Sequence, residues 1–254
     1  MKNPNYFAMA FSVFAFSLLI TSCLEEDFDV AAIQYAAEEI QVVNSDDPGT
    51  VILGTSNLYG KPVKEWTKDW WKYVISFNRA QCPLNPFQSL VGTSGQIGPV
   101  HCLVGSKNGV ATRNIETTPT KALLVPVINT IKTYPNADTS FKPAPGQTVE
   151  QFLKISADKL MDQATNLSVK LDGKAIAITD ANRFATNVFS ITGNKDLGNY
   201  LELGITGKQQ SAVSDGYFVT IDKLPVGDHE LIVHAEIPQK GIKTDVTYTI
   251  SVRK

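Results

Sequence analysis

The clearest pattern of hydrophobic and polar positions lies in residues 61–77. Apolar side chains recur there at spacings of three and four, which places them on one face of an amphipathic helix. Pro62 suits the first turn of such a helix, where its missing N–H has no partner to lose. The apolar face comprises Val63, Trp66, Trp70, Tyr73, Val74 and Phe77. Trp71 lies beside this face and is expected to be partly exposed.

A second helix is predicted over residues 149–163. Thr148 and Gln151 have the spacing of a capping box, in which each side chain bonds to the backbone N–H of the other residue. The apolar side of this helix is expected to comprise Phe152, Ile155, Leu160 and Met161.

From Leu167 onward, short runs of β-branched and apolar residues alternate with turn signals, which predicts strands. The predicted strands cover residues 168–171, 175–178, 183–191, 212–221, 230–237 and 245–252. The Asp172-Gly173 pair between the first two is a strong hairpin signal. We therefore expect a mainly-β, α+β fold with two helices, built as an antiparallel β-sandwich.

The middle of the chain has weaker patterns. Residues 98–105 predict a short strand, and residues 122–128 form an apolar run. Pro126 interrupts that run and indicates an edge strand or a bulge. Residues 79–118 are too many for a plain connection, so they form either a functional loop region or several short strands.

The N-terminus has the pattern of a bacterial lipoprotein signal peptide. Lys2 precedes an apolar run over residues 7–20, and Ser22-Cys23 follows it. In such proteins the cysteine is lipidated and becomes the new N-terminus, so several acyl chains on Cys23 would anchor the chain stably. An uncleaved anchor or an ordinary secretory signal is the alternative. We expect a lipid anchor in the bacterial envelope, at the outer membrane.

The predicted organisation has three parts: a signal peptide over residues 1–22, a lipidated tether over 23–56, and a single β-rich domain over 57–254. The tether starts with an acidic cluster at 25–29, which resembles the surface-export signal of Bacteroidota lipoproteins; an ordinary solvated tether is the alternative. A short helix is expected at 29–40.

Composition narrows the class of protein. The 254 residues carry 23 Lys plus Arg against 25 Asp plus Glu, a formal charge of −2, which argues against a basic nucleic-acid binder. With 43% hydrophobic residues, the chain is not a disordered one.

Two cysteines remain after Cys23. An extracytoplasmic location permits a disulfide between Cys82 and Cys102. It would close a loop of about 20 residues and contribute about 3 kcal/mol in the chain-entropy model. Two unpaired buried thiols are the alternative.

The order of motifs over roughly residues 60–254 resembles an uncharacterised family of secreted bacterial and archaeal proteins. The matching motifs are the tryptophans Trp66, Trp70 and Trp71, Asn85-Pro86, Gly95 to Val100, Gly105, Arg113, Leu124 to Asn129, Asp172-Gly173, Arg183, Asp215-Gly216-Tyr217 and Leu224 to His229. Where members of that family often carry a cysteine pair, this chain has Thr93 or Ser94 and Ile115. The resemblance implies a secreted fold and carries no established activity.

No catalytic motif or metal-ligand spacing stands out, so we predict no catalytic residue, no metal and no cofactor. Five polar residues lie beside glycine or proline, or at the ends of apolar runs: Asn85, Gln96, Arg113, Asn129 and Asp215. The favoured interpretation is a hydrogen-bond network that holds loops in place. The alternative is a pocket in which Arg113 binds a carboxylate or sulfate, with Trp71 as a sugar-stacking contact.

The predicted function is a non-catalytic surface or periplasmic binding module for a glycan or a protein partner, attached to the membrane through its lipid. A hydrolase or lyase acting on an extracellular polymer through residues 79–118 is one alternative. A structural component of the envelope is the other.

Overall fold

The structure, a computed structural model, describes residues 50–52, 57–85, 95–107 and 109–254. The predicted signal peptide, Cys23, the acidic cluster and the helix at 29–40 lie outside the described residues. No helix in the described ranges is long and apolar enough to cross a membrane.

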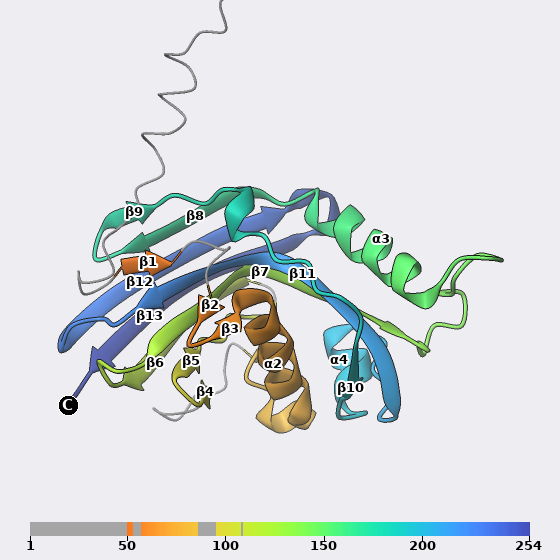
Figure 1. The fold of residues 1–254 in the computed structure, drawn as a ribbon, viewed down its shortest axis with the longest axis horizontal. Helices are drawn as coiled ribbons and strands as arrows, with labels where there is room; N and C mark the ends of the chain where they lie inside the picture. Colours follow the sequence, from red (N-terminus) through yellow and green to blue (C-terminus); the bar gives the residue numbers. More distant parts are fainter. Residues whose placement is uncertain (1–49, 53–56, 86–94, 108) are drawn as a thin grey trace, which may run out of the picture. The chain divides into compact units, whose positions relative to one another are not determined.

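The mainly-β, α+β class is confirmed. Two large sheets dominate the fold (Figure 1). The first has the strand order β1-β11-β7-β5-β4, with β10 also paired to β11, and the second has the order β6-β13-β12-β8-β9. The strands of the first sheet are β1 (Thr50–Ile52), β4 (Gln96–Ile97), β5 (Val100–Cys102), β7 (Ala122–Tyr134), β10 (Phe189–Thr192) and β11 (Gln209–Asp222). Those of the second are β6 (Gly109–Thr117), β8 (Thr165–Leu171), β9 (Lys174–Ile176), β12 (Gly227–Ile237) and β13 (Ile242–Val252).

The two large sheets share one hydrophobic core. Val219 of β11 belongs to the same buried cluster as Val233 of β12 and Val246 of β13. This packing fits the predicted sandwich arrangement. Most strand pairs are antiparallel, but β6 pairs with β13 and β5 pairs with β7 in parallel, so the sheets are mixed rather than purely antiparallel.

Helix α2 (Val63–Ser76) packs against the first sheet on the face opposite the second sheet. Alternate residues of a strand point to opposite faces, and Phe218 of β11 belongs to the cluster of Trp66 and Trp70, whereas Val219 belongs to the core between the sheets. A small hairpin, β2 (Asn57–Leu58) with β3 (Lys61–Pro62), leads into the helix.

Helix α3 (Val149–Met161) covers β7 and β11 where these long strands extend towards Tyr134 and Gln209 (Figure 1). The predicted capping box is present, with Thr148 accepting from the Gln151 N–H. Its buried residues are Leu153, Ala157 and Met161, whereas Ile155 is 58% exposed. The prediction that Ile155 faces the core is therefore wrong, because the i, i+4 row from Leu153 to Met161 faces the strands. A short helix that was not predicted, α4 (Leu197–Leu201), follows β10.

Three further expectations need correction. Trp71 is only 3% exposed. The predicted strand at 183–191 is reduced to β10, since the chain before it forms a 3-10 turn (Asp180–Asn182) and then runs irregularly beside β11. The apolar run at 122–128 continues to Tyr134 as β7, and its register with β11 shifts opposite Tyr217 and Phe218. Pro126 is thus at a bulge, as predicted.

The weakly patterned region around residues 79–118 contains short strands. Its described residues include a 3-10 turn (Arg79–Gln81), β4, β5 and β6. Strand β1 lies within the segment predicted as a tether and pairs with β11.

Candidate functional site

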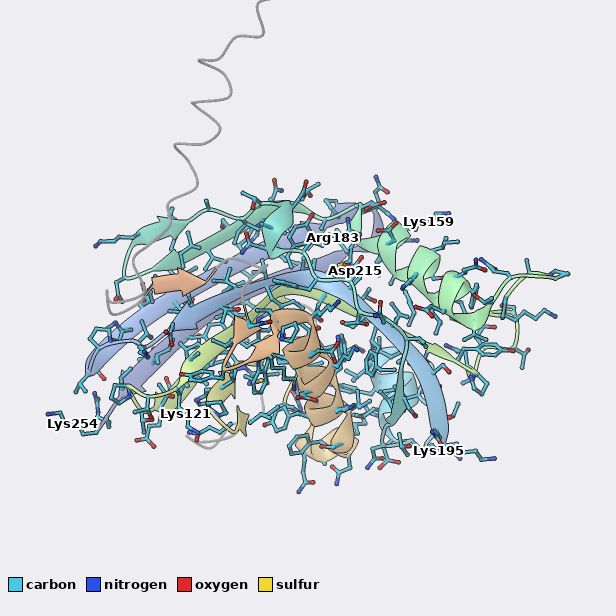
Figure 2. All side chains as sticks on the ribbon, viewed as in Figure 1. Lys121, Lys159, Arg183, Lys195, Asp215 and Lys254 are labelled. Atoms are coloured by element: carbon cyan, nitrogen blue, oxygen red, sulfur yellow. The ribbon has the colours of Figure 1, made fainter. Side chains whose placement is uncertain are left out.

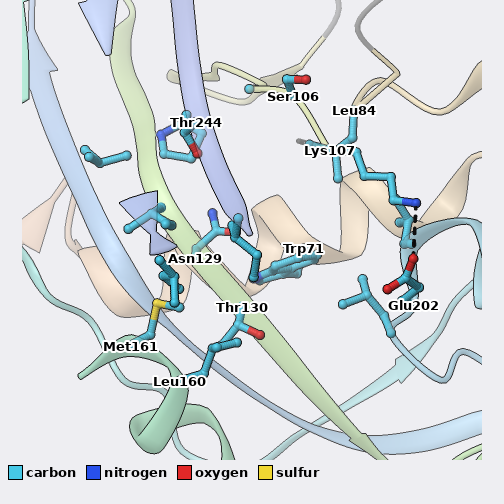
Figure 3. A pocket seen from close by; sticks show the side chains of 18 of the residues that line it. Trp71, Leu84, Ser106, Lys107, Asn129, Thr130, Leu160, Met161, Glu202 and Thr244 are labelled. Carbon is cyan, nitrogen blue, oxygen red and sulfur yellow. Dashed lines mark ion pairs between the residues drawn. The ribbon is translucent and has the colours of Figure 1, made fainter. Parts of the chain in front are cut away.

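A cavity of about 260 Å³ lies along the outer edge of β7 (Figure 3). Strand β5 pairs with β7 only from Ala122 to Leu124, and the cavity is lined by the β7 residues that follow, Pro126–Thr130 and Lys132. The other walls come from α2, the loop at 105–107, the end of α3, the end of α4 with the two residues after it, Ile237 and the start of β13. The volume is slightly below the roughly 300–1,000 Å³ of ordinary small-molecule pockets.

Local sequence explains why the edge is shaped this way. Proline has no backbone N–H, so Pro126 cannot donate to a neighbouring strand. Opposite the cavity segment, Gly216 of β11 pairs with Asn129. A Cβ on Gly216 would lie 2.3 Å from the Cβ of Asn129, so only glycine lets the two strands approach with Asn129 in this position.

Most of the cavity wall is apolar. The apolar side chains are Trp70, Leu84, Val127, Ile128, Leu160, Met161, Leu201, Leu203, Ile237 and Ile242. Polar and charged residues make up much of the rest: Trp71, Ser106, Asn129, Thr130, Thr244, three lysines and Glu202. A ligand site commonly combines apolar side chains with polar groups that orient the ligand.

The three tryptophans of α2 differ in how their indole N–H groups are used. Trp66 Nε1 donates to the Leu58 carbonyl at 3.0 Å, and Trp70 Nε1 donates to the Leu103 carbonyl at 2.7 Å. The Trp71 Nε1, although buried, has no acceptor among the described residues. An unsatisfied buried donor costs about 1–3 kcal/mol. The indole of Trp71 therefore presents an unused donor at the cavity wall.

A second polar atom at the cavity wall is also buried without a partner among the described residues. Ser106 Oγ is buried and has no hydrogen-bond partner among the described residues. Next to it, Lys107 Nζ lies 3.8 Å from Glu202 Oε1 and 4.7 Å from the centre of the Tyr200 ring. Figure 3 shows this ion pair on one side of the cavity and Leu160 and Met161 on the other.

The charges at the wall are mostly positive. Lys107, Lys132 and Lys243 line the cavity together with one acid, Glu202. Lys243 pairs with Asp245 at 3.1 Å. The side chain of Lys132 has no hydrogen bond or ion pair within the described part of the chain. Burial lowers the pKa of Lys132, and the nearby charge of Lys240 lowers it further.

Arg113 serves the fold rather than a pocket. It is 2% exposed, and its Nη2 lies 3.0 Å from the Pro83 and Asn85 carbonyls and 2.9 Å from the Gly105 carbonyl. Burial lowers the pKa of its guanidinium. The favoured interpretation, a network that holds loops, fits these bonds. Arg113 thereby fixes the loop at 105–107, which forms one wall of the cavity.

Asp215 belongs to a different cluster. It is 1% exposed and accepts hydrogen bonds from Arg183 Nε at 3.2 Å and Nη2 at 2.7 Å. Arg183 also bonds to Asp158 at 2.7 Å and Asp162 at 2.6 Å, both on or next to α3. Figure 2 shows Arg183 and Asp215 beside this helix. The bonds to Asp215 are the main reason for a raised pKa of Arg183.

The predicted set of five polar residues therefore does not form one site. Among them, only Asn129 lines the cavity, together with Trp71. Asn85 offers its backbone carbonyl to Arg113, and Gln96 lies in β4 opposite His101. The sequence did not point to Lys132 or Ser106. A lysine within the apolar run of β7 is a signal that could have been used for Lys132.

The predicted disulfide is wrong. Cys82 and Cys102 are both buried free thiols. Burial raises the pKa of Cys102 to about 12, and the charge of Asp69 adds to this effect. Burial also raises the pKa of Cys82. Neither thiol is therefore activated as a nucleophile.

Within the described ranges, no three His, Cys, Asp or Glu side chains are grouped so that they would hold a metal ion. No family model matches this chain, and neither a curated protein nor a solved structure matches it. The proposals below therefore rest on the geometry of the cavity and on the sequence.

Proposed function

We propose that this protein is a non-catalytic binding module that holds a small organic molecule in the cavity beside β7. The observation that carries the proposal is the Trp71 indole: it is buried, it faces an apolar cavity, and its N–H has no acceptor among the described residues. A ligand oxygen in the cavity would accept that hydrogen bond. Ser106 Oγ offers a second polar contact at the same wall.

The size and shape of the site favour a small molecule over the glycan or protein partner that the sequence suggested. The cavity is bounded by α2, α3, the end of α4, the loop at 105–107 and both large sheets, whereas protein-binding sites are extended surfaces. A single sugar or a similarly small metabolite fits the proposal.

Location at the envelope is part of the proposal and rests on the sequence alone. A lipidated Cys23 would hold the binding module at the outer membrane. Metabolic labelling with an alkyne analogue of palmitate tests this step: the full chain and Cys82→Ser should take up the label, and Cys23→Ser should not. If Cys23→Ser took up as much label as the unmodified chain, lipidation at Cys23 would be refuted.

The binding function is tested by thermal shift of the full chain against libraries of sugars and organic acids. A ligand at 100 times its Kd stabilises the folded state by about 2.7 kcal/mol. Ser106→Trp places a large side chain at the cavity wall and should abolish the shift. Ser168→Trp introduces the same side chain on the exposed face of β8 and should leave it unchanged. A shift that persists in Ser106→Trp would place the ligand elsewhere.

A further inference from the structure

Strand β7 leaves part of its backbone unpaired where it borders the cavity. Strand β11 pairs along one edge of β7, and β5 pairs with the other edge only from Ala122 to Leu124. From Pro126 onward, no strand of the described ranges lies beside this outer edge. A free strand edge offers backbone N–H and C=O groups to another extended chain.

The register of the sheet shows which groups point outward. In an antiparallel pair, the N–H and C=O of a residue point to the same side, and this side alternates along the strand. The Gly216 carbonyl accepts a hydrogen bond from the Phe184 N–H at 2.8 Å, on the edge of β11 away from β7. Asn129 lies opposite Gly216, so its own N–H and C=O point away from β11, towards the cavity. Within the described part of the chain, neither backbone group of Asn129 has a hydrogen bond.

Trp71, whose indole N–H has no acceptor among the described residues, packs on the face of β7 that Asn129 occupies. Trp71 and Ile131 belong to one buried cluster. Asn129 is two residues from Ile131 in β7, so its side chain is on the same face of the strand. Trp71 and Asn129 both line the cavity, and Figure 3 shows them at β7. The cavity therefore presents an indole N–H together with the N–H and C=O of a strand edge.

We infer that the cavity binds a short peptide in an extended conformation. One residue of the peptide exchanges two backbone hydrogen bonds with Asn129, and a peptide carbonyl accepts the Trp71 indole N–H. This inference rests on the proposed binding function and specifies its ligand. It corresponds to the addition of a strand to a sheet edge, at the place where β5 no longer covers β7.

Other small molecules complement these groups less well. An organic acid in its ionised form offers only acceptors, so it would leave the Asn129 carbonyl without a donor. A sugar carries hydroxyl groups around its ring, and the apolar wall, which includes Leu160 and Met161, would leave several of them without partners. A peptide residue with an apolar side chain places its polar groups at the strand edge and its side chain against the apolar wall.

The test adds N-acetyl-leucine N′-methylamide, a leucine with a peptide bond on each side, to the full chain. The chain has three tryptophans, so its ¹H–¹⁵N spectrum has three indole signals, and Trp71→Phe identifies the one that belongs to Trp71. In a sample labelled with ¹⁵N at asparagine only, Asn129→Asp identifies the backbone signal of Asn129. We expect the peptide to shift both signals in a saturable way with one Kd, and to leave the indole signal of Trp66 little changed.

Recognition of the peptide backbone is measured by the ratio of two Kd values. In the matched ester, an oxygen atom replaces the leucine N–H, so the ligand keeps its shape and loses the donor for the Asn129 carbonyl. The ester should bind about fivefold more weakly, the ratio that corresponds to a net hydrogen-bond contribution of about 1 kcal/mol. Trp71→Phe should weaken both ligands by about the same factor and leave their ratio unchanged. Trp66→Phe is the matched control, since Trp66 does not line the cavity, and both Kd values should stay as in the unmodified protein.

The outcomes separate the two claims. Equal binding of the peptide and its ester, or a peptide that shifts the Trp71 signal but not the Asn129 signal, overturns the peptide inference while the cavity remains a ligand site. If the peptide moves neither signal, but a compound of the sugar or organic-acid libraries moves the Trp71 signal, the peptide inference is also overturned. If neither the peptide nor any compound of those libraries moves the Trp71 signal, the proposed binding function fails as well.

Discussion

Arg183 is expected to be the most important single cation for stability, because it compensates a buried carboxylate. Asp215 is 1% exposed and accepts two hydrogen bonds from the Arg183 guanidinium. Arg183→Met removes the cation and leaves the Asp215 charge in the protein interior. Breaking a buried ion pair from one side costs about 3–5 kcal/mol, a large part of the roughly 5–15 kcal/mol that stabilises an ordinary domain.

The exposed carboxylates that also bond to Arg183 should contribute much less to stability than the buried Asp215. The side chains of Asp158 and Asp162 are 64% and 58% exposed, so Asp158→Asn and Asp162→Asn should each cost about 0.2–1 kcal/mol. Asp215→Asn removes the buried charge and keeps an acceptor for Arg183, so its expected cost is about 1–2 kcal/mol. The double variant Arg183→Met with Asp215→Leu should be more stable than Arg183→Met alone, since no uncompensated charge remains.

Urea unfolding of the full chain at neutral pH, followed by circular dichroism, measures these differences. The slope of the free energy of unfolding against urea must stay constant for the values to be compared. The reasoning is refuted if Arg183→Met costs less than about 1 kcal/mol. It is also refuted if the double variant is no more stable than Arg183→Met.

Three further predictions concern other parts of the fold. Burial opposes protonation of His229, but its hydrogen bonds to Asp172 and the Pro225 carbonyl outweigh that effect and raise the pKa of His229. The stability that protonated His229 contributes is therefore present below the ordinary histidine pKa and is lost as the pH rises through the raised pKa. His229→Gln should thus destabilise the protein more at pH 5.5 than at pH 8.5 in urea unfolding, and an equal loss at both would contradict this. Thr148→Ala removes the cap of α3 and should lower the free energy of unfolding by about 1 kcal/mol, whereas Thr148→Ser should be about as stable as the unmodified protein. Equal losses of stability in Thr148→Ala and Thr148→Ser would argue against the cap. Because both core thiols are free and buried, Ellman's reagent should label them only after unfolding, and a reductant should leave the melting temperature unchanged; a reductant-sensitive melting temperature would indicate a disulfide.

The elements that sequence predicted well depend on neighbours in the chain. The amphipathic spacing in α2, the capping box of α3 and the turn at Asp172-Gly173 all involve residues a few positions apart. The bulge at Pro126 follows from the missing N–H of proline. These features have local physical causes, so the mainly-β fold with two principal helices could be expected before the structure was known.

The expectations that failed depend on distant neighbours. Trp71 was expected to be partly exposed because it lies beside the apolar face of its helix, but it belongs to the buried cluster that α2 forms with the first sheet and α4. The five polar residues resembled one site along the chain, yet Asp215 points towards Arg183 and α3, whereas Arg113 holds loops. Which face of a strand a polar residue occupies depends on register, and register is set by the whole sheet.

The sequence by itself determined the local elements and their order, because hydrogen bonding and side-chain spacing within a segment are short-range effects. Only the tertiary structure decided the state of the thiols and the position of the cavity. It also showed that, of three neighbouring tryptophans, Trp71 is the one whose N–H has no acceptor among the described residues. These properties depend on burial and on partners such as Leu103, 33 residues away from Trp70, and the chain brings such groups together only when the sheets and helices pack.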